Sequence, residues 1–328
     1  MSDTYEISAL TNAQSWDEFV RRALGGMVFS TWGWLECAQE ASGNPFRCLG
    51  CFKNGQLVAG LSGVETQRAG MRRFSTPALT PHGGLLLAPV PGKGPAKAES
   101  EWHQVAQLLI AHLQKEYHHL SLAHAPAVND MRPFTWAGWE ARVRYTYQVE
   151  MGDREGLWER LERRTRTVIR KAEASGLVVE PTQDMKLFRQ QYERLYARQG
   201  GRMPVDAGVA QRFAEAACRA GLARALKVTS PEGQVAAVVV FVEGFEGRYA
   251  WVAGADPGLN HTGATSLLYW KYLEQGQGRF DFVGANIPAI AFFKRGFGGD
   301  LVSYFAVEGF RDPLVKGLFA GARALRSL

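Results

Sequence analysis

One order of predicted elements occurs twice in this sequence of 328 residues, and the repeat limits the folds that the chain can adopt. Each copy contains a strand, a tight turn, two further strands, a glycine-containing loop, a helix and a short final strand. The turns are Asn54-Gly55 in the first copy and Pro231-Glu-Gly233 in the second. Such turns between alternating apolar runs indicate β-hairpins. The repeat predicts a duplicated α/β architecture with mixed sheets flanked by helices.

The bounds of the two copies follow from their turns and apolar runs. The strands predicted for the first copy are Phe46–Phe52, Gln56–Thr66, Arg72–Ser75 and His119–Ala123, and its helix is Glu99–Tyr117. The strands predicted for the second copy are Ala223–Thr229, Gln234–Glu243, Arg248–Gly254 and Arg279–Val283, and its helix is Thr262–Gln275. We therefore expect two domains, over residues 1–150 and 151–328.

Further helices are predicted outside the two copies, together with a strand at 145–153 that leads into the second domain. These helices are Trp16–Leu24, Thr31–Ala41, Asp153–Ser175, Met185–Gln199, Asp206–Ala220 and a basic amphipathic helix over Asp312–Leu325. Asp153 and Asp206 suit N-cap positions, where a carboxylate accepts hydrogen bonds from free backbone N–H groups. Gly176 and Gly221 suit the positions that follow helices, because glycine adopts left-handed backbone conformations readily.

Composition is typical of a soluble globular protein. Apolar residues make up 46% of the chain and charged residues 21%. No apolar run approaches the ~20 residues that span a bilayer, so we expect no membrane insertion. The segment Met1–Glu6 has neither the basic nor the apolar region of a secretory signal. A net charge of +6 favours anionic partners such as nucleotides, CoA or tRNA without requiring one.

The cysteines indicate neither a metal site nor a disulfide framework. Cys48 and Cys51 are spaced as Cys-x-x-Cys, but they lie within the alternating run of a predicted strand. Residues three apart on a strand point to opposite faces, so these two thiols cannot share a metal ion or a disulfide there. We expect no bound metal and a location in the reducing cytoplasm.

The segment Phe280–Gly299 contains the residues most suggestive of chemistry. It predicts a short buried strand, a Gly-Ala-Asn turn, one amphipathic helix and a glycine stop. Lys294 falls where that helix ends, and it suits either a helix C-terminus or a fixed cation beside developing negative charge. Asp281 lies just before the turn, where its carboxylate could accept a proton from an attacking amine. It could equally hold Asn286 or the adjacent backbone.

Two other segments offer groups that suit phosphate. The predicted helix Asp153–Ser175 has a basic face, on which Glu159 and Glu162 stand four residues before Arg163 and Arg166. A solvated basic surface explains this face equally well. The loop at the start of the Thr262–Gln275 helix combines glycine with small polar residues, and it is made of Asn260, His261, Thr262, Gly263, Ala264 and Thr265. Free N–H groups at a helix start bind phosphate, although Thr262 would also serve as an ordinary N-cap.

The segment Phe280–Gly299 resembles the last strand–helix unit of GNAT-type acyltransferases, and its Phe293-Lys294-x-x-Phe297-Gly298 ending resembles the FemAB-like branch. Residues 166–176 are similar to that branch's Arg-x-x-Ile-Arg-Lys-Ala helix. The resemblance implies tandem GNAT-like domains, here without a coiled-coil arm. It also implies transfer of acyl or aminoacyl groups to amines, with Lys294 beside Phe293 stabilising negative charge. Phosphate contacts by Arg166 and Arg170, and a phosphate cradle at the Asn260–Ala264 loop, are implied as well.

Several positions depart from the family pattern. Phe292 occupies the place of the tyrosine that protonates the leaving thiolate in GNAT acetyltransferases. Trp34 matches an early family motif, but Cys37 stands where its phosphate-binding lysine is expected. Pro81-His82-Gly83-Gly84 replaces the family's Pro-Arg-Gly-Pro loop. These departures argue against a nucleotide-linked muropeptide as the acceptor.

We therefore expect an N-acyltransferase in which an amine attacks an activated donor directly, since no set of residues for a covalent intermediate is present. The co-substrate is acyl-CoA or aminoacyl-tRNA, and no tightly bound cofactor is expected. The acceptor is a small-molecule or peptide amine, with peptidoglycan-related chemistry and charged tRNA as the implied context. The alternative is a non-catalytic GNAT-fold module that binds an anionic ligand. A nucleic-acid binder is disfavoured because the basic residues gather on one helix without interleaved aromatic residues.

Overall fold

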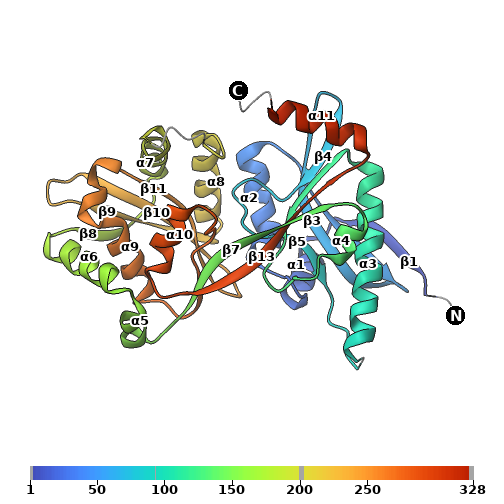
Figure 1. Cartoon of the computed structure of the whole chain (residues 1–328), viewed down its shortest axis with the longest axis horizontal. Helices are drawn as coiled ribbons and strands as arrows, with labels where there is room; N and C mark the ends of the chain where they lie inside the picture. The colour runs from blue at the N-terminus through green and yellow to red at the C-terminus, as the bar shows by residue number, and fades with distance from the viewer. Residues whose placement is uncertain (1–2, 93, 199–202, 325–328) are drawn as a thin grey trace. The chain divides into compact units, whose positions relative to one another are not determined.

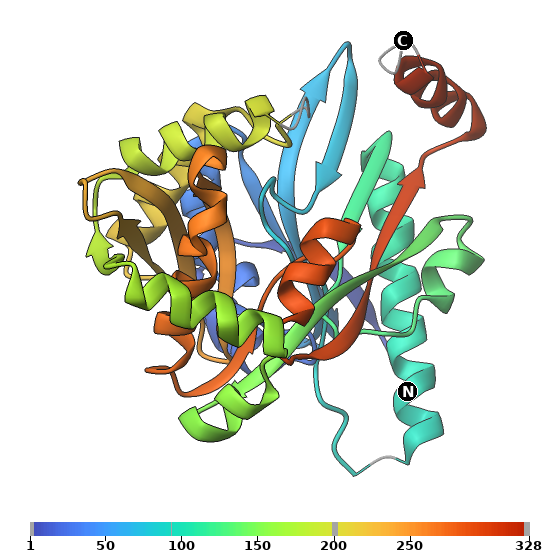
Figure 2. The ribbon, with the colours of Figure 1, turned by 60° about the vertical axis from the view of Figure 1, so that its left-hand side comes forward.

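The computed structural model describes residues 3–92, 94–198 and 203–324, which form two compact units (Figures 1 and 2). Unit 1 contains the chain up to Gln39, Gly43–Val143 and the chain from Tyr304 onward. Unit 2 contains Glu40–Ser42 and Arg144–Ser303. Two predicted helix ends, Gln199 and Leu325, lie outside the described residues.

Unit 1 is built on a mixed sheet with the strand order β1-β2-β3-β4-β6-β13, and β5 pairs with β3. The strands are β1 (Tyr5–Leu10), β2 (Phe46–Lys53), β3 (Gln56–Arg68), β4 (Met71–Ser75), β5 (Gly84–Leu87), β6 (His119–Ala123) and the part of β13 (Asp300–Phe310) that follows Ser303. Asn54 and Gly55 both have positive φ, which suits the predicted tight turn between β2 and β3. The pairing is antiparallel except between β4 and β6.

The helices of unit 1 surround one main core. They are α1 (Ala13–Arg22), the 3-10 turn η1 (Val28–Ser30), most of α2 (Trp32–Ser42), α3 (Pro95–Glu116), α4 (Arg132–Trp136) and α11 (Pro313–Ala324). Leu109 and Leu113 of α3 pack against Leu61 and Leu120 of the sheet. Cys48 and Cys51 are free thiols buried in two different apolar clusters, which confirms that they point to opposite faces of β2.

Unit 2 repeats the pattern of unit 1 with the strand order β7-β12-β11-β10-β9-β8. The strands are β7 (Glu140–Met151), β8 (Val178–Thr182), β9 (Ala223–Thr229), β10 (Val235–Glu243), β11 (Arg248–Ala255) and β12 (Gly278–Asp281). One pair, β11 and β12, is parallel, and it occupies the place that β4 and β6 hold in unit 1. The predicted duplication is therefore present in the sheets. Strands β1, β5, β8 and β13 were not predicted.

Helices cover both faces of the sheet in unit 2 (Figure 1). They are α5 (Arg154–Arg160), α6 (Arg163–Ala174), α7 (Met185–Arg198), α8 (Ala207–Arg219), the 3-10 segment η2 (Pro257–Thr262), α9 (Ala264–Leu273) and α10 (Pro288–Arg295). On one face, Phe241 stacks on Tyr272 of α9 with ring centroids 3.7 Å apart. On the other face, Phe213 of α8 contacts Trp251 at 4.8 Å. No helix in the described part of the chain is both long enough and apolar enough to cross a membrane.

The single predicted helix over Asp153–Ser175 is wrong, because the structure divides it into α5 and α6 (Figure 2). Leu161 has an extended ψ of 139° and ends α5. A tertiary contact explains the break: the Glu162 N–H donates to the Gly296 carbonyl at 2.9 Å, and its carboxylate pairs with Arg295 at 3.0 Å. The predicted caps are confirmed, since Asp153 accepts from Gly156 N–H and Asp206 from Gly208 N–H.

Unit 1 takes its last strand from the C-terminal part of the sequence. In unit 1, β6 pairs with β13, and the register places Ala306 opposite Ala123. In unit 2, β12 pairs with β7, and Asp281 lies opposite Gln148. Most of β7 is continuous in sequence with the rest of unit 2, whereas the chain from Tyr304 onward returns to unit 1. The sequence did not predict this return of the C-terminal segment.

Candidate functional site

The candidate site in unit 2 is centred on the turn between β12 and α10. Val283 and Gly284 both have left-handed backbones, with φ of 51° and 63°. Glycine adopts this conformation readily, but a β-branched residue such as Val283 does so rarely. The Val283 N–H donates to Asp281 Oδ1 at 2.7 Å, and the Ala285 N–H donates to the Tyr145 carbonyl at 2.7 Å. Hydrogen bonds on both sides thus hold the turn.

Lys294 is buried near the end of α10, and 9% of it is exposed. Helical side chains lean toward the helix N-terminus, and the ammonium accordingly lies at the preceding turn. It donates to the carbonyl oxygens of Val283 and of Gly284, the latter at 2.7 Å. One of its three donors remains for another partner. Burial lowers the pKa of Lys294 to about 8, while the charge of Asp281 acts to raise it.

Asp281 lies fully buried at the end of β12. Thr146 Oγ1 donates to its Oδ1 at 2.6 Å, and Gln148 Nε2 donates to its Oδ2 at 2.7 Å. With the bond from the Val283 N–H, three donors from two segments converge on this carboxylate. The structure therefore realises the expected hold on the adjacent backbone. Asn286 is held differently, because its side-chain oxygen accepts from the Tyr145 N–H at 2.9 Å.

The two phenylalanines of α10 occupy different environments. Phe293 packs into the core of unit 2, with its ring centroid 5.4 Å from Tyr269 and 5.3 Å from Phe297. Phe292, at the position where the resemblance implies a tyrosine, is 61% exposed and lies 5.0 Å from the guanidinium carbon of Arg295. Core packing thus explains Phe293, and the position of the missing general acid is on the surface.

The loop before α9 differs in detail from the prediction. The helix begins after Gly263, whose φ is 77°, so Thr262 is not its N-cap. The Thr262 hydroxyl accepts from the Ala264 N–H at 3.3 Å, and Asn260 is exposed in η2. Thr265 and Ser266 follow at the second and third helical positions, where N–H groups have no carbonyl partner in their own helix. Thr265 belonged to the predicted loop, whereas Ser266 was not predicted as a site residue.

Helix α6 packs against both this loop and the residue that follows α10. A Cβ atom on Gly263 would lie 2.6 Å from Cγ1 of Val168, and a Cβ atom on Gly296 would collide with the hydroxyl of Thr165. Both glycines are needed because α6 packs so closely on the two segments. Helix α6 therefore packs against both the α9 loop and the end of α10.

The two predicted phosphate-contacting arginines have other partners in this structure. Arg166 Nη1 donates to the carbonyl oxygens of Trp158 and Glu159, at 3.3 and 2.9 Å, and so binds the end of α5. The guanidinium carbon of Arg170 lies 5.2 Å from the ring centre of Trp158. The predicted side-chain pairing of Glu162 with Arg166 is absent among these described contacts. Val168, rather than either arginine, faces the α9 loop.

Part of strand β11 has an unpaired edge on the side of β12. The described pairing of these parallel strands covers two positions, Arg248 with Phe280 and Tyr249 with Asp281. Beyond these two positions, the described strand pairing of Ala250 and of Val252–Ala255 is with β10. An open strand edge offers backbone N–H and C=O groups to an extended ligand.

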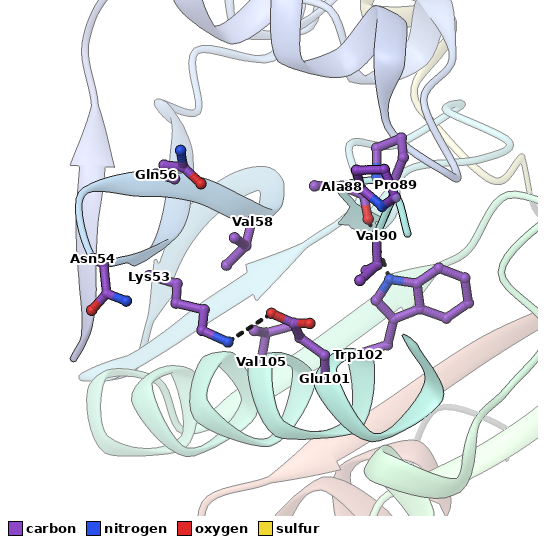
Figure 3. A pocket seen from close by; sticks show the side chains of 11 residues that line it. Lys53, Asn54, Gln56, Val58, Ala88, Pro89, Val90, Glu101, Trp102 and Val105 are labelled. Atoms are coloured by element: carbon purple, nitrogen blue, oxygen red, sulfur yellow. Dashed lines mark hydrogen bonds and ion pairs between the residues drawn. The ribbon is translucent and has the colours of Figure 1, made fainter. Parts of the chain in front are cut away.

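Unit 1 contains a separate cavity of about 260 Å³ (Figure 3). Val58, Trp102 and Val105 form part of its apolar wall, and Lys53 and Glu101 form an ion pair of 2.8 Å at one side. None of the predicted site residues lines this cavity. In the described part of the chain, no cluster of three or more histidine, cysteine, aspartate or glutamate side chains is arranged to hold a metal ion.

Comparisons with known proteins identify the fold. Residues 159–295 match the family model of the acetyltransferase (GNAT) domain. A crystal structure of FemX is similar over 93% of this chain and 97% of its own, with a TM-score of 0.68 and 12% identity. The structure of a tandem GNAT protein from the clavulanic acid biosynthesis pathway is similar over 94% of this chain and 99% of its own chain. Its TM-score is 0.51 and its sequence identity is 15%.

A third similar structure is that of L-PGS from Bacillus licheniformis, which covers 98% of this chain and 99% of its own at a TM-score of 0.51 and 12% identity. No curated protein sequence matches this chain. At these identities the solved structures establish the fold alone. The fold predicted from the sequence, two tandem GNAT-like α/β domains, is confirmed.

Proposed function

Residues 159–295 carry a GNAT acetyltransferase domain within a chain that has the tandem GNAT fold of FemX, and from this premise we propose that the protein is an N-acyltransferase. It moves an acyl or aminoacyl group from an activated donor to an amine. The observation that carries the proposal is the buried ammonium of Lys294, which has one N–H donor left after its bonds to the carbonyl oxygens of Val283 and Gly284. A preorganised cation in a site of low polarity stabilises negative charge that develops in a transition state.

The reaction proposed is direct acyl transfer. The amine nitrogen attacks the donor carbonyl carbon, a C–N bond forms, and the carbonyl oxygen becomes an oxyanion. The bond from carbon to the leaving sulfur of CoA, or to the leaving ribose oxygen of tRNA, then breaks. The amine loses one proton, and the leaving group gains one. Positioning of the two substrates and stabilisation of the oxyanion supply most of the rate.

Lys294 is the catalytic residue of this proposal. Its remaining N–H donor stabilises the oxyanion or the negative charge of the donor, and Phe293 anchors the end of α10 through its contacts with Tyr269 and Phe297. Asp281 was predicted as an acceptor for the amine proton or as a hold on nearby backbone, and a separate experiment below distinguishes these two roles.

The donor site proposed for unit 2 combines the open edge of β11 with the start of α9. The acyl-bearing arm of the donor would pair with the β11 edge, and its phosphate would lie at the loop made of Asn260, Thr262, Gly263 and Ala264, with the N–H groups of Thr265 and Ser266. Arg166 and Arg170 remain proposed phosphate contacts. To bind phosphate, Arg166 would have to give up its bonds to the α5 carbonyl oxygens, and Arg170 would have to leave the ring of Trp158.

The acceptor proposed is a small-molecule or peptide amine, in a cytoplasmic and peptidoglycan-related setting. In unit 1, Cys37 is 5% exposed. His82 is fully buried, with its ring 4.7 Å from that of Tyr304. Neither residue offers an exposed cation where the family binds acceptor phosphates. This supports an acceptor that lacks a nucleotide diphosphate.

Transfer from two donor classes tests the proposal. Purified protein is offered labelled acetyl-CoA, and separately a pool of charged tRNA, each with mixed amine acceptors. Lys294→Met is expected to lower kcat/KM by roughly 10²–10³, the effect of losing one donor to an oxyanion. Lys186→Met, which removes an exposed lysine from the same unit, is the matched control and should transfer at the wild-type rate.

The alternative is a binding module that keeps the fold without catalysis. The exposed Phe292 in place of a general acid favours this alternative. Saturable binding of acetyl-CoA or charged tRNA with no transfer from either donor would establish the module. Transfer that survives Lys294→Met unchanged would instead keep the reaction and remove Lys294 from it.

A further inference from the structure

Asp281 has the contacts of an anchor. Its two carboxylate oxygens accept hydrogen bonds from Thr146 Oγ1, Gln148 Nε2 and the Val283 N–H, all between 2.6 and 2.7 Å. A general base must present a lone pair to the proton that it removes. A fully buried carboxylate that three donors already hold is poorly arranged for that task. Its position instead suits fixing the groups that donate to it.

Among those donors, Val283 has a backbone conformation that needs to be held. A left-handed conformation costs a β-branched residue about 1–2 kcal/mol, and such strain persists only where the surroundings enforce it. Asp281 binds the N–H of Val283, and Lys294 binds its carbonyl oxygen. Asp281 and Lys294 thus form hydrogen bonds with the two opposite peptide groups of one strained residue.

We propose that Asp281 is a positioning residue for Lys294: it fixes the left-handed turn at Val283 and Gly284, whose carbonyl oxygens orient the ammonium, and its negative charge stabilises that ammonium. The inference rests on the proposed function for its catalytic meaning. The geometric part concerns only the side chains and backbone of unit 2, and it can be measured without any turnover.

The charged groups around Lys294 support the electrostatic part. Asp281 is the charged residue that raises the lysine pKa against the opposing effect of burial. The β7 side chains that touch Asp281, Thr146 and Gln148, are neutral. On β11, burial raises the pKa of Tyr249, which therefore stays neutral as well. On α6, the carboxylate of Glu162 is paired with Arg295.

The decisive variant is Asp281→Asn, which removes the charge and keeps the shape. The new amide oxygen can accept from Thr146 and Val283, and Gln148 can rotate its amide to accept from the new NH₂ group. The hydrogen-bond network is therefore preserved. Asp300→Asn is the matched control, because Asp300 is an acid of the same unit that is 79% exposed and pairs with Arg160 at the surface.

The readout is the titration of Lys294 by NMR of lysine-labelled protein, with its signal assigned by its loss in Lys294→Arg. Asp281→Asn is expected to move the Lys294 titration to lower pH by about one pH unit, the usual effect of losing a nearby opposite charge. Asp300→Asn should leave it in place. An unchanged Lys294 titration in Asp281→Asn would overturn the proposal, whether or not the protein transfers acyl groups.

The pH dependence of kcat/KM then separates a positioning role from a base. For a positioning residue, the decline of the rate at high pH moves down with the Lys294 titration, and the plateau at lower pH changes less than about tenfold. For a general base, Asp281→Asn lowers the rate by about 10²–10⁴ at every pH. That second result would overturn the assignment even if the lysine titration moves.

A second variant covers the case in which Asp281→Asn does not fold. Val283→Gly removes the strain that Asp281 is proposed to hold, because glycine accepts positive φ without cost. The double variant Asp281→Asn/Val283→Gly is expected to fold, and its Lys294 titration is compared with that of Val283→Gly alone. If the double variant also fails to fold, Asp281 serves the core of unit 2 rather than the turn, and the proposal is wrong.

Discussion

Lys294 keeps its charge in an environment that disfavours it, and this has a cost in folding free energy. Burial moves its pKa from an ordinary value of 10.5 to about 8. Between these two pH values the unfolded chain binds more protons than the folded chain. The stability of the folded chain therefore rises as pH increases through this range. Below pH 8 the lysine is protonated in both states, and its contribution no longer changes with pH.

The first prediction concerns this linkage. From pH 7.5 to 9.5, the free energy of unfolding of the wild type, measured by urea denaturation, should rise relative to that of Lys294→Met. The expected gain is about 2 kcal/mol, from 1.36 kcal/mol for each pH unit above 8. The range ends before tyrosines of the unfolded chain ionise near pH 10. Two curves that stay parallel across this range would show that Lys294 titrates normally.

A second prediction tests whether Arg166 stabilises the end of α5. Arg166→Gln loses the bonds to the carbonyl oxygens of Trp158 and Glu159, and we expect the unfolding free energy to fall by about 1 kcal/mol. Arg164→Gln removes an exposed arginine from the same helix and should change it by less than about 0.5 kcal/mol. Equal losses in the two variants would mean that Arg166 does not stabilise the end of α5.

At the scale of elements, the close packing of helix α6 on the α9 loop depends on the absence of a side chain at Gly263. The residue has a φ of 77°, and a Cβ atom would lie 2.6 Å from Val168. Gly233, in the turn between β9 and β10, has a φ of 80°, and a Cβ atom there would have no neighbouring atom within 4 Å. The two glycines therefore share the backbone strain that alanine would suffer, but only Gly263 adds a clash.

The third prediction compares these two sites. Gly233→Ala should cost about 1 kcal/mol, the effect of a left-handed backbone alone. Gly263→Ala should cost about 1–3 kcal/mol more, because the new methyl group has to displace α6. Chemical denaturation of both variants measures the difference. A difference near zero would show that α6 moves away freely and does not fix the α9 loop.

Elements with local signals were predictable from the sequence. The Asn54-Gly55 turn and the caps at Asp153 and Asp206 are confirmed because their conformations depend on the residues themselves. The four-residue β5 and the break at Leu161 were missed. The break depends on the Gly296 carbonyl, more than a hundred residues away, which binds the Glu162 N–H. No window of neighbouring residues contains that information.

The same distinction applies to the candidate site. The place of Lys294 at the end of α10 could be predicted from the helical pattern and the glycine that follows it. The direction of its ammonium could not, because it depends on the left-handed backbone of Val283 and on Asp281 across the turn. Asp281 was predicted with two possible roles for the same reason. Its partner Thr146 lies on a strand 135 residues earlier.

At the scale of the whole molecule, unit 1 depends on both its N-terminal segments and the C-terminal part of the sequence. Strand β6 has its neighbour β13 only when residues 306–310 are present. Without them, the edge of β6 is open, and the His119 ring loses the contacts with Phe310 and Phe319 at 5.0 and 4.5 Å. A fragment that ends at residue 150 therefore lacks part of unit 1.

The fourth prediction follows from this dependence. In hydrogen exchange, the amides of β6 should be protected in the full chain and should exchange at least tenfold faster in fragment 1–150. Joining residues 304–328 to that fragment through a flexible glycine–serine linker should restore the protection. Full protection in fragment 1–150 alone would mean that its own segment 144–150 takes the place of β13, and that β13 is dispensable for the protection of β6.

Strand β13 also sets the order in which the chain can mature on the ribosome. Strand β6 emerges early, but residues 124–303 must be synthesised before its neighbour appears. At about 5–20 residues per second this wait lasts on the order of 10–40 s. For that time a nascent chain carries an open strand edge, the kind of surface that attracts other strands. The unit encoded first is therefore the last to be finished, and newly made chains would need protection by chaperones until translation is complete.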